Sequence, residues 1–398
     1  MTARSPDLAR TALAVLLFLV AWGALHVGFY EREQIVDTPV YESYGQAMED
    51  GQVPYRDFAV EYPPGALPVF LVPALADSDF RTVFEWLMAL CGCGMVVAVA
   101  LAGRRLGFGF GTLAFVALSP LAIGSVILTR FDLWPAMLAS FALAALVHGR
   151  LRLGHCLLGA SIAAKLYPAV LLPLTVAYVW RRRGRREGIV CALLAVGIPL
   201  VAYLPFAVLA PEGVVRSVGR QLSRPLQIES LGSAVLLAAH DLFGVGVEVA
   251  SSHGSQNLTG TSADVLAVAL SVAQVSVLAW LWLAFARSRE MPSPVTLALY
   301  AAATLTAFVA LGKVLSPQFL IWLVPVVVLA RRWSANAMLA AALVLTQIWF
   351  PFRYWDLVRE LDARVSWLVL ARDFVLLALL ASLLSAVRKP ARGSPHSA

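Results

Sequence analysis

The segment from 37 to 70 concentrates side chains that could do chemistry on a sugar hydroxyl. It holds Asp37, Asp57 and Glu61 among four tyrosines, and it comes soon after the first apolar run of the chain. A carboxylate in such a place can act as a general base toward an acceptor hydroxyl. Tyrosine rings offer apolar faces with a polar edge, which suit a sugar ring. The competing interpretation is a solvated loop with interfacial aromatic residues.

Cationic residues elsewhere could hold a phosphate, and each has a structural alternative. Arg56 can pair with Asp57 beside it, and Arg130 and Asp132 bracket the start of an apolar run, where they can pair with each other. Lys165 is expected at the tip of a helical hairpin, where an unpaired ammonium would be costly in a membrane. The expected substrate-binding residues are Tyr41, Tyr55, Arg56, Tyr62, Arg130, Asp132, Lys165, Arg220, Arg224, Lys313 and Gln318.

These residues belong to a chain that is rich in apolar segments. Of its 398 residues, 60% are hydrophobic and only 14% are charged, whereas soluble domains carry about 25% charge. Long segments without a polar face recur along the whole length, as expected of helices that cross a bilayer. The net charge of +7 is concentrated in short basic clusters between them, such as 104–105 and 181–186. That pattern is typical of cytoplasmic loops and argues against a nucleic-acid partner.

The order of apolar segments and basic clusters predicts an all-α, polytopic transmembrane protein with about 10–12 spans in one integral membrane domain, residues 1–387. The first span is followed by a long extracytoplasmic loop at 29–81. A second outside region covers 211–262, and its short apolar piece at 231–243 is expected to be re-entrant or interfacial. Both termini are placed in the cytoplasm, and 388–398 is expected to be a disordered tail.

One stretch, 154–180, has basic clusters on both sides, so both of its ends should face the cytoplasm. Two short antiparallel helices that turn near 165–168 satisfy this requirement, and Pro168 disfavours helix at the residue before it. The other spans are expected at 8–28, 82–103, 108–128, 131–148, 188–210, 263–286, 293–312, 315–331, 336–352 and 366–387.

Several motifs resemble glycosyltransferase family 87, whose members are membrane enzymes of the GT-C class that include polyprenyl-phosphate-mannose-dependent mannosyltransferases. The motifs are Asp37, Tyr41, Gly51, Pro54-Tyr55, Asp57-Phe58, Glu61-Tyr62-Pro63-Pro64, TRFDLWP at 129–135, KLYP at 165–168 and SPQFLIWLVP at 316–325. The resemblance covers most of the chain. It implies a GT-C-type fold in the plasma membrane and transfer of a sugar, most readily mannose, from a polyprenyl-phosphate donor to a glycolipid or polysaccharide acceptor. The reaction would take place on the extracytoplasmic side with inversion.

In that class an acidic residue of the first outside loop is the catalytic base, and Asp37 is the matching position; Asp57 and Glu61 are the alternatives. The base must deprotonate the acceptor, while cations stabilise the departing phosphate. The chain has no glycine-rich phosphate loop, which argues against a nucleotide-sugar donor. Paired acids in the first loop permit a divalent metal without requiring one, and none of the four cysteines has metal-ligand spacing with a histidine.

Two other functions compete with this interpretation. Twelve spans also suit a transporter or lipid flippase, but transporters commonly place ionisable residues near the bilayer midplane at broken helices. The acids here cluster in predicted outer loops instead. A non-catalytic assembly factor of an envelope-polysaccharide pathway is the third interpretation, and it predicts that Asp37 is dispensable.

Overall fold

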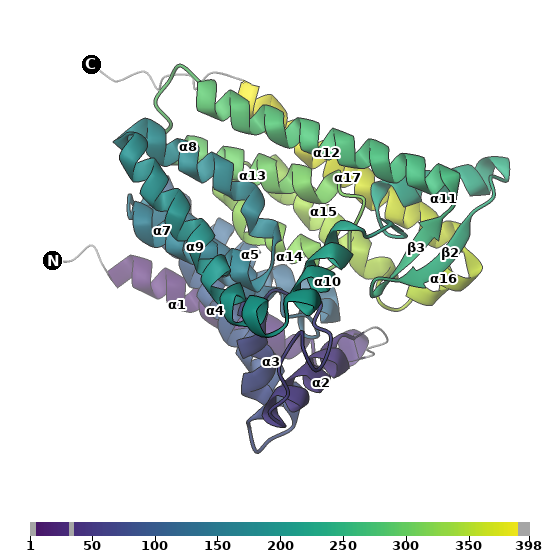
Figure 1. Cartoon of the computed structure of the whole chain (residues 1–398). Coiled ribbons are helices and arrows are strands. Elements are labelled where there is room, and N and C mark those ends of the chain that lie inside the picture. The colour runs from purple at the N-terminus through teal and green to yellow at the C-terminus, as the bar shows by residue number, and fades with distance from the viewer. Residues whose placement is uncertain (1–4, 32–35, 389–398) are drawn as a thin grey trace.

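The chain forms a bundle of helices with a small three-stranded sheet near one end (Figure 1). The structure is a computed structural model that describes residues 5–31 and 36–388. The predicted tail, 388–398, therefore lies outside the described residues except for Arg388. Helices account for most of the described chain, which confirms the predicted all-α, polytopic membrane architecture.

Twelve helices match the twelve predicted passes in order and approximate position. They are α1 (Ser5–Ala24), α4 (Phe80–Leu106), α5 (Phe110–Ile123), α6 (Leu133–Val147), α7 (Leu151–Ala164), α8 (Leu172–Arg183), α9 (Arg185–Leu209), α12 (Thr261–Arg287), α13 (Pro294–Ala310), α14 (Phe319–Val327), α15 (Trp333–Trp349) and α17 (Ala363–Arg388). Short helices η3 (Gly124–Ile127), η4 (Tyr167–Leu171) and η5 (Val328–Ala330) extend or connect them.

The lengths of these helices divide them into two groups. Within the described residues, six segments are long and apolar enough to cross a membrane, or seven if α15 and the short helix α16 (Tyr354–Glu360), which meet at a bend of 66°, form one broken span. Two of the six, α9 and α12, have only 11% of their apolar window buried. Helices that are apolar all round and yet exposed belong in lipid. The shorter helices α6, α7, α13 and α14 are largely buried among the others, and the number of complete passes stays a prediction.

The predicted hairpin at 154–180 is confirmed. Helix α7 ends at Ala164, and Lys165 adopts an extended conformation with φ −157° and ψ 140°. The chain then turns through η4, which has Pro168 near its start, and continues as α8. Arg152 near the start of α7 and Arg183 at the end of α8 line the same hollow, so the two helices return to one end of the bundle. The basic clusters on both sides of the segment thus lie together, as their charge pattern required.

The second outside region, 211–262, contains elements that the sequence analysis did not predict. It consists of α10 (Pro211–Leu222), β1 (Leu226–Gln227), α11 (Leu231–Phe243), β2 (Glu248–Ser252) and β3 (Ser255–Thr259), with strand order β1-β3-β2. The turn between β2 and β3 places His253 and Gly254 at φ 54° and 69°. Positive φ at both central residues is what a tight two-residue hairpin requires. The apolar piece at 231–243, expected to be re-entrant or interfacial, is α11, which packs against α17 and α12.

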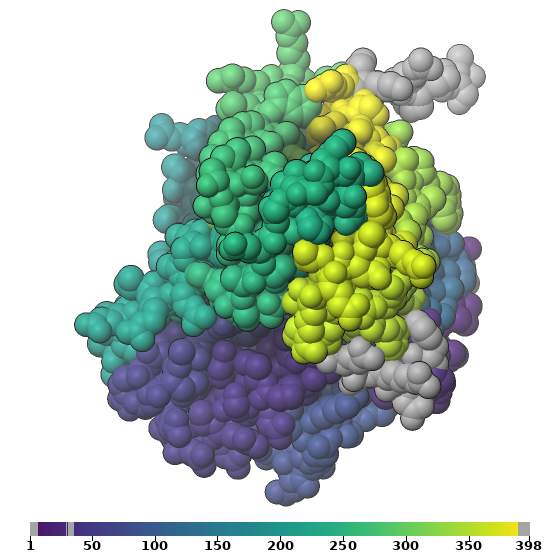
Figure 2. Space-filling view, turned by 90° about the vertical axis from the view of Figure 1, so that its right-hand side faces the viewer, coloured from purple at the N-terminus to yellow at the C-terminus, as the bar shows by residue number. Residues whose placement is uncertain are grey.

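The described part of the predicted first loop, 29–81, is folded onto the bundle. It contains η1 (Gly28–Glu31), α2 (Thr38–Glu49), η2 (Pro64–Ala66) and α3 (Leu67–Ala74). In Figure 2 this purple segment covers the lower part of one face, beneath the teal and green atoms of the second outside region and the yellow atoms around α16. We call this face, which carries α2, α10, the sheet and α16, the site end of the bundle. The opposite end carries the arginine clusters and is called the basic end.

The first loop is seated on the bundle by a close backbone contact at Gly65. A Cβ atom at this position would lie 2.6 Å from the carbonyl carbon of Ala163, in the last turn of α7. Backbone atoms cannot move aside as a flexible side chain does, so only glycine fits. Nearby, the Trp134 indole N–H donates a hydrogen bond to the Gly65 carbonyl at 3.0 Å. The two contacts hold the loop against α6 and α7.

The change Gly65→Ala is therefore expected to lower the free energy of unfolding by about 1–3 kcal/mol, the usual cost of overpacking. Thermal unfolding of the purified protein in detergent measures the effect. Gly197→Ala in α9 is the matched control, because a Cβ there meets nothing within 4 Å. An unfolding temperature for Gly65→Ala equal to that of the control would show that the loop is not seated on α7.

Candidate active site

Asp37 and Arg130 form an ion pair at the site end. Asp37 is the residue before α2, but its carboxylate makes no capping hydrogen bond to that helix. Instead Oδ1 lies 3.0 Å from Nη1 of Arg130, and Oδ2 accepts a longer hydrogen bond, 3.3 Å, from the Tyr41 hydroxyl. The Asp37 side chain is 33% exposed, whereas that of Arg130 is only 5% exposed. The Asp37 carboxylate is thus accessible to solvent, while the Arg130 guanidinium that binds it is buried.

The predicted pairing of Arg130 with Asp132 is wrong. Asp132 is fully buried at the start of α6, and its Oδ1 accepts hydrogen bonds from the Lys165 ammonium at 2.7 Å and from the Trp322 indole N–H at 2.6 Å. Lys165 reaches it from the break after α7, and Trp322 from α14. A carboxylate in such surroundings needs a cation at hydrogen-bonding distance, and the break after α7 supplies one.

Aromatic rings separate the two ion pairs. Phe131, between Arg130 and Asp132 in the chain, packs edge to face with Tyr41 at 5.6 Å and with Tyr62 at 4.8 Å between ring centroids. The Lys165 ammonium lies 4.6 Å from the centroid of Phe131 and 5.8 Å from that of Tyr62. Cations over ring faces are attracted by the ring quadrupole. The rings therefore hold Lys165 and leave its side chain only 15% exposed.

A third group of charges lies between the first loop and α10. Arg220 is 3.8 Å from the Glu61 carboxylate, and the Gln221 amide donates to the Glu61 carbonyl at 3.0 Å. Arg224, just after α10, has a buried Nε without a hydrogen-bond partner among the described residues. Burial lowers the pKa of Arg224, and Glu61, Tyr62, Glu229 and Asp37 oppose that shift. Arg224 is therefore a cation that lies among Glu61, Glu229, Asp37 and Tyr62 of the candidate site.

The structure leaves some of the predicted residues outside this cluster. Arg56 and Asp57 pair with each other at 2.9 Å in an exposed turn. Hydrogen bonds from Arg56 and from the Val53 N–H lower the pKa of Asp57 to about 2. Both contacts are local, which is the structural alternative considered for Arg56 from the sequence.

Three more predicted residues make structural contacts. The Tyr55 hydroxyl donates to the Tyr62 carbonyl at 2.6 Å, so Tyr55 supports the cluster from behind. Lys313 donates to the Leu222 carbonyl at 3.5 Å, and Gln318 accepts from the Ser316 hydroxyl at 2.7 Å. These contacts order the connection that leads into α14, the helix that carries Trp322.

Sequence reasoning missed a buried charged group behind the Asp37–Arg130 pair. Arg372 of α17 is fully buried and donates from Nη2 to the Glu229 carbonyl at 2.6 Å, and its Nε lies 2.7 Å from the Asp373 carboxylate. Glu229, 1% exposed, accepts a hydrogen bond from the Gln227 amide. An adjacent arginine and aspartate inside the apolar run 366–387 were a usable signal, because ionisable residues in a span are rarely without a role. Glu229 gave no such signal, since it lies in a polar connection.

The acids do not gather into a metal site in the part of the chain that the structure describes. No three His, Cys, Asp or Glu side chains there are placed to share an ion. The arrangement instead alternates carboxylates with guanidinium and ammonium groups. Such a site can hold an anion and accept a proton from a nearby hydroxyl.

Comparison with known protein families gives the enzyme class of this chain. The sequence model of glycosyltransferase family 87 matches residues 60–317. The chain belongs to glycosyltransferase family 87. It is therefore a membrane glycosyltransferase that uses a sugar donor and an acceptor. The matched region includes Glu61, Arg130, Asp132, Lys165 and Arg224 but begins after Asp37. No curated protein matches the chain.

Family membership also decides between the functions inferred from the sequence. The alternative of a transporter or flippase is not supported by a match to a glycosyltransferase family over most of the chain. The buried Asp132–Lys165 pair at a helix break could by itself have suggested transport. In this family 87 glycosyltransferase, it lies directly behind the exposed carboxylate at the site end.

Removing the Asp132 charge is expected to destabilise the protein strongly. Asp132→Asn leaves the Lys165 ammonium without its counter-ion, and breaking a buried pair in this way costs about 3–5 kcal/mol. Chemical unfolding in detergent measures the loss. Glu187→Gln, which removes the partner of the exposed Arg152, is the control and is expected to unfold close to the wild type. Equal effects of the two changes would contradict the assignment of Asp132–Lys165 as a structural pair.

The stability of the enzyme is expected to depend on pH through Glu229. Burial raises the pKa of Glu229 from 4.5 to about 8, while Arg372 and Arg130 oppose the shift. Between these values the folded state holds a proton that the unfolded chain has released, so this residue's contribution to stability falls as pH rises through the window.

Glu229→Gln removes the titrating group, so the fall in stability that this residue causes as pH rises should disappear. The difference in free energy of unfolding, variant minus wild type, is expected to increase by up to about 1.4 kcal/mol for each pH unit between the two pKa values of Glu229. Chemical unfolding of both proteins at several pH values between 5 and 8 measures the difference. A difference that stays constant with pH would mean that Glu229 does not titrate in this range.

Proposed function

We propose that this family 87 enzyme transfers a sugar, most readily mannose, from a polyprenyl-phosphate donor to a cell-envelope glycolipid or glycan on the extracytoplasmic side of the plasma membrane. Asp37 is the general base, and the reaction inverts the anomeric centre. The observation that carries the proposal is the partly exposed Asp37 carboxylate on the buried Arg130. Arg224, whose buried Nε has no hydrogen-bond partner among the described residues, interacts electrostatically with Asp37.

The geometry of Asp37 suits a base. Arg130 fixes Oδ1, while Oδ2 has only the long contact to Tyr41 among the described residues, and the Asp37 side chain is 33% exposed. Oδ2 can therefore accept the proton of an acceptor hydroxyl as that oxygen bonds to the anomeric carbon. Direct displacement requires the base and the departing phosphate to lie on opposite faces of the sugar.

The leaving group needs cations, because the phosphate gains one negative charge when its bond to the anomeric carbon breaks. Arg224 is suited to this role, because its buried Nε has no partner in the described part of the chain and guanidinium groups bind phosphate oxygens in pairs. Arg220 and Lys165 can add positive potential, although each already contacts a carboxylate. A lipid-linked donor also agrees with the exposed apolar helices, along which a polyprenyl chain can lie.

The distribution of charge supports an extracytoplasmic reaction. The arginine clusters lie at the basic end, which the positive-inside rule assigns to the cytoplasm. Asp37, Glu61 and Arg224 lie at the site end. The proposed reaction is thus extracytoplasmic, and both described chain ends, α1 at its start and α17 at its finish, lie at the basic end (Figure 1).

Replacing the base tests the proposal. Membranes that contain equal amounts of wild type or Asp37→Asn receive radiolabelled polyprenyl-phosphate-mannose and a lipid acceptor extract, and transfer is followed by chromatography. Asp37→Asn is expected to lose at least about 100-fold in rate, the usual contribution of a general base. Asp57→Asn is the comparison, because its carboxylate has only local partners, and it is expected to retain activity.

Other outcomes would redirect the mechanism. Activity of Asp37→Asn at the wild-type level would remove this residue as base, leave Glu61 as the candidate and agree with an assembly role for the loop. Failure of the wild type to transfer from any polyprenyl-phosphate sugar would overturn the donor class.

A further inference from the structure

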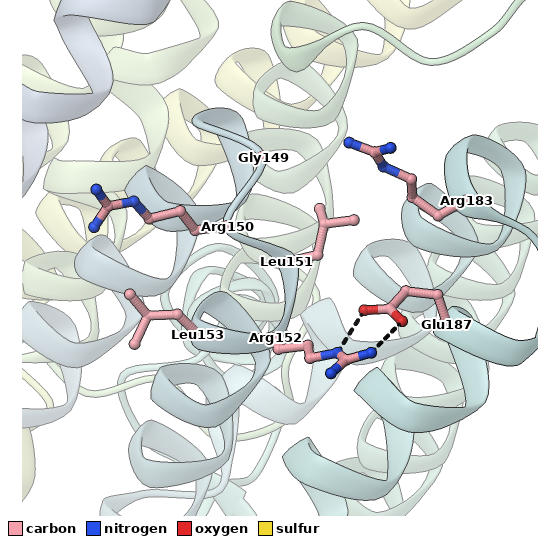
Figure 3. Close-up of a pocket in the computed structure, with 7 residues that line it drawn as sticks. All are labelled: Gly149, Arg150, Leu151, Arg152, Leu153, Arg183 and Glu187. Atoms are coloured by element: carbon pink, nitrogen blue, oxygen red, sulfur yellow. Dashed lines mark hydrogen bonds and ion pairs between the residues drawn. The ribbon is translucent and has the colours of Figure 1, made fainter.

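The basic end of the bundle carries a hollow of about 530 Å³ where α7 begins, α8 ends and α9 begins. Its lining residues are Gly149, Arg150, Leu151, Arg152, Leu153, Arg183 and Glu187 (Figure 3). An α-helix rises about 1.5 Å per residue, so the length of α7 places the hollow about 20 Å from Lys165. The hollow is therefore distinct from the candidate active site.

The hollow has an excess of positive charge. Three guanidinium groups and one carboxylate line it, a net of two positive charges. Arg152 donates from Nε and Nη2 to the two Glu187 oxygens at 2.8 and 2.9 Å, which neutralises both groups. Among the residues that the structure describes, the guanidinium groups of Arg150 and Arg183 have no hydrogen-bond or ion-pair partner. In Figure 3 Arg183 extends toward Leu151, while Arg150 extends along the side that carries Leu153.

Neighbouring arginines of the 181–186 cluster are committed to the protein itself. Arg181 donates to the carbonyls of Phe285, Ser288 and Glu290, and Arg182 donates to that of Pro292. The Arg185 guanidinium lies 5.9 Å from the centroid of the Trp180 ring. Arg183 differs from these three, because its charge is not used in any such contact. Arg186 also makes no such contact with the described residues, but it does not line the hollow, so Arg183 and Arg150 are the cations available to a ligand there.

The surroundings of the hollow are apolar and face lipid. Leu153, in its lining, is 47% exposed. Further along α9, Ile189 and Leu193 are 42% and 66% exposed, and only 11% of the apolar window of this helix is buried. A ligand that satisfies both parts of the surface needs an anionic head and a hydrocarbon tail.

We propose that this hollow binds the phosphate of an anionic phospholipid from the surrounding bilayer. Arg183 binds the phosphate oxygens, Arg150 on the other side of Leu151 adds positive potential, and the acyl chains lie against Ile189 and Leu193 of α9. Basic pockets between membrane helices are suited to anionic head groups, and guanidinium groups match phosphate geometry. The bound lipid contacts both the start of α7 and the end of α8. It thereby stabilises the α7–α8 hairpin, which carries Lys165 at its other end.

The test uses the full chain purified in detergent. Binding of phosphatidylglycerol and of phosphatidylcholine is measured by native mass spectrometry and by the rise in unfolding temperature. The double change Arg150→Gln with Arg183→Gln is expected to weaken phosphatidylglycerol binding about 25-fold, from roughly fivefold for each arginine. The control is Arg104→Gln with Arg105→Gln, two exposed arginines that also lie at the basic end but do not line the hollow. It is expected to bind as the wild type does.

Two further measurements test whether the ligand is a lipid or free phosphate, and whether the double variant loses binding only because it misfolds. Inorganic phosphate without lipid is expected to give less than a tenth of the thermal shift, and an equal shift would overturn the lipid assignment. Equal binding of phosphatidylcholine, or unchanged phosphatidylglycerol binding by the double variant, would also overturn it. Arg183→Glu tests the same site separately by placing a like charge against the phosphate. It is expected to lose binding at least as strongly as the double variant.

Discussion

The cost of burying charge in an apolar surrounding is the constraint on which the site end depends. Asp132 is fully buried, and an isolated carboxylate there would be strongly unfavourable. Its ammonium partner comes from the break after α7 and its indole partner from α14, so three parts of the bundle must meet at one oxygen. The extended conformation of Lys165 is what allows its side chain to cross from the end of α7 to α6.

The packing around this oxygen prepares the exposed part of the site. Phe131 lies between Arg130 and Asp132 in the chain. Each of these two neighbours belongs to one of the two ion pairs. Its ring packs against Tyr41 and Tyr62 of the first loop, and Gly65 lets that loop approach α7 closely. A layer of aromatic rings thus lies between the Lys165–Asp132 ion pair, whose carboxylate is fully buried, and the Asp37 carboxylate, which solvent can reach. The low dielectric around Asp132 strengthens its pairing with Lys165, whereas the Asp37 side chain of the outer pair is 33% exposed.

The sequence predicted which residues form this site better than it predicted which of them pair with each other. Asp37, Tyr41, Tyr62 and Arg130 were all named from their types and their place after an apolar run, and they do lie together. The pairing of Arg130 with Asp132 was wrong because each has a partner from a distant part of the chain, Asp37 for Arg130 and Lys165 for Asp132. Glu229 and Arg372 could not be joined from sequence, since 143 positions separate them. The β2–β3 hairpin was missed because its short polar strands lack a clear alternating pattern.

Composition and charge order alone determined that this is a polytopic helical membrane protein, the order of its apolar segments and the break near Lys165. These are local properties: a segment either is or is not apolar enough for lipid, and basic clusters fix which end of a helix faces which side. Only the tertiary structure decided which cation neutralises which acid and which arginines remain free. Those choices depend on distances between helices far apart in the chain, and ionic interactions in an apolar interior change steeply with such distances.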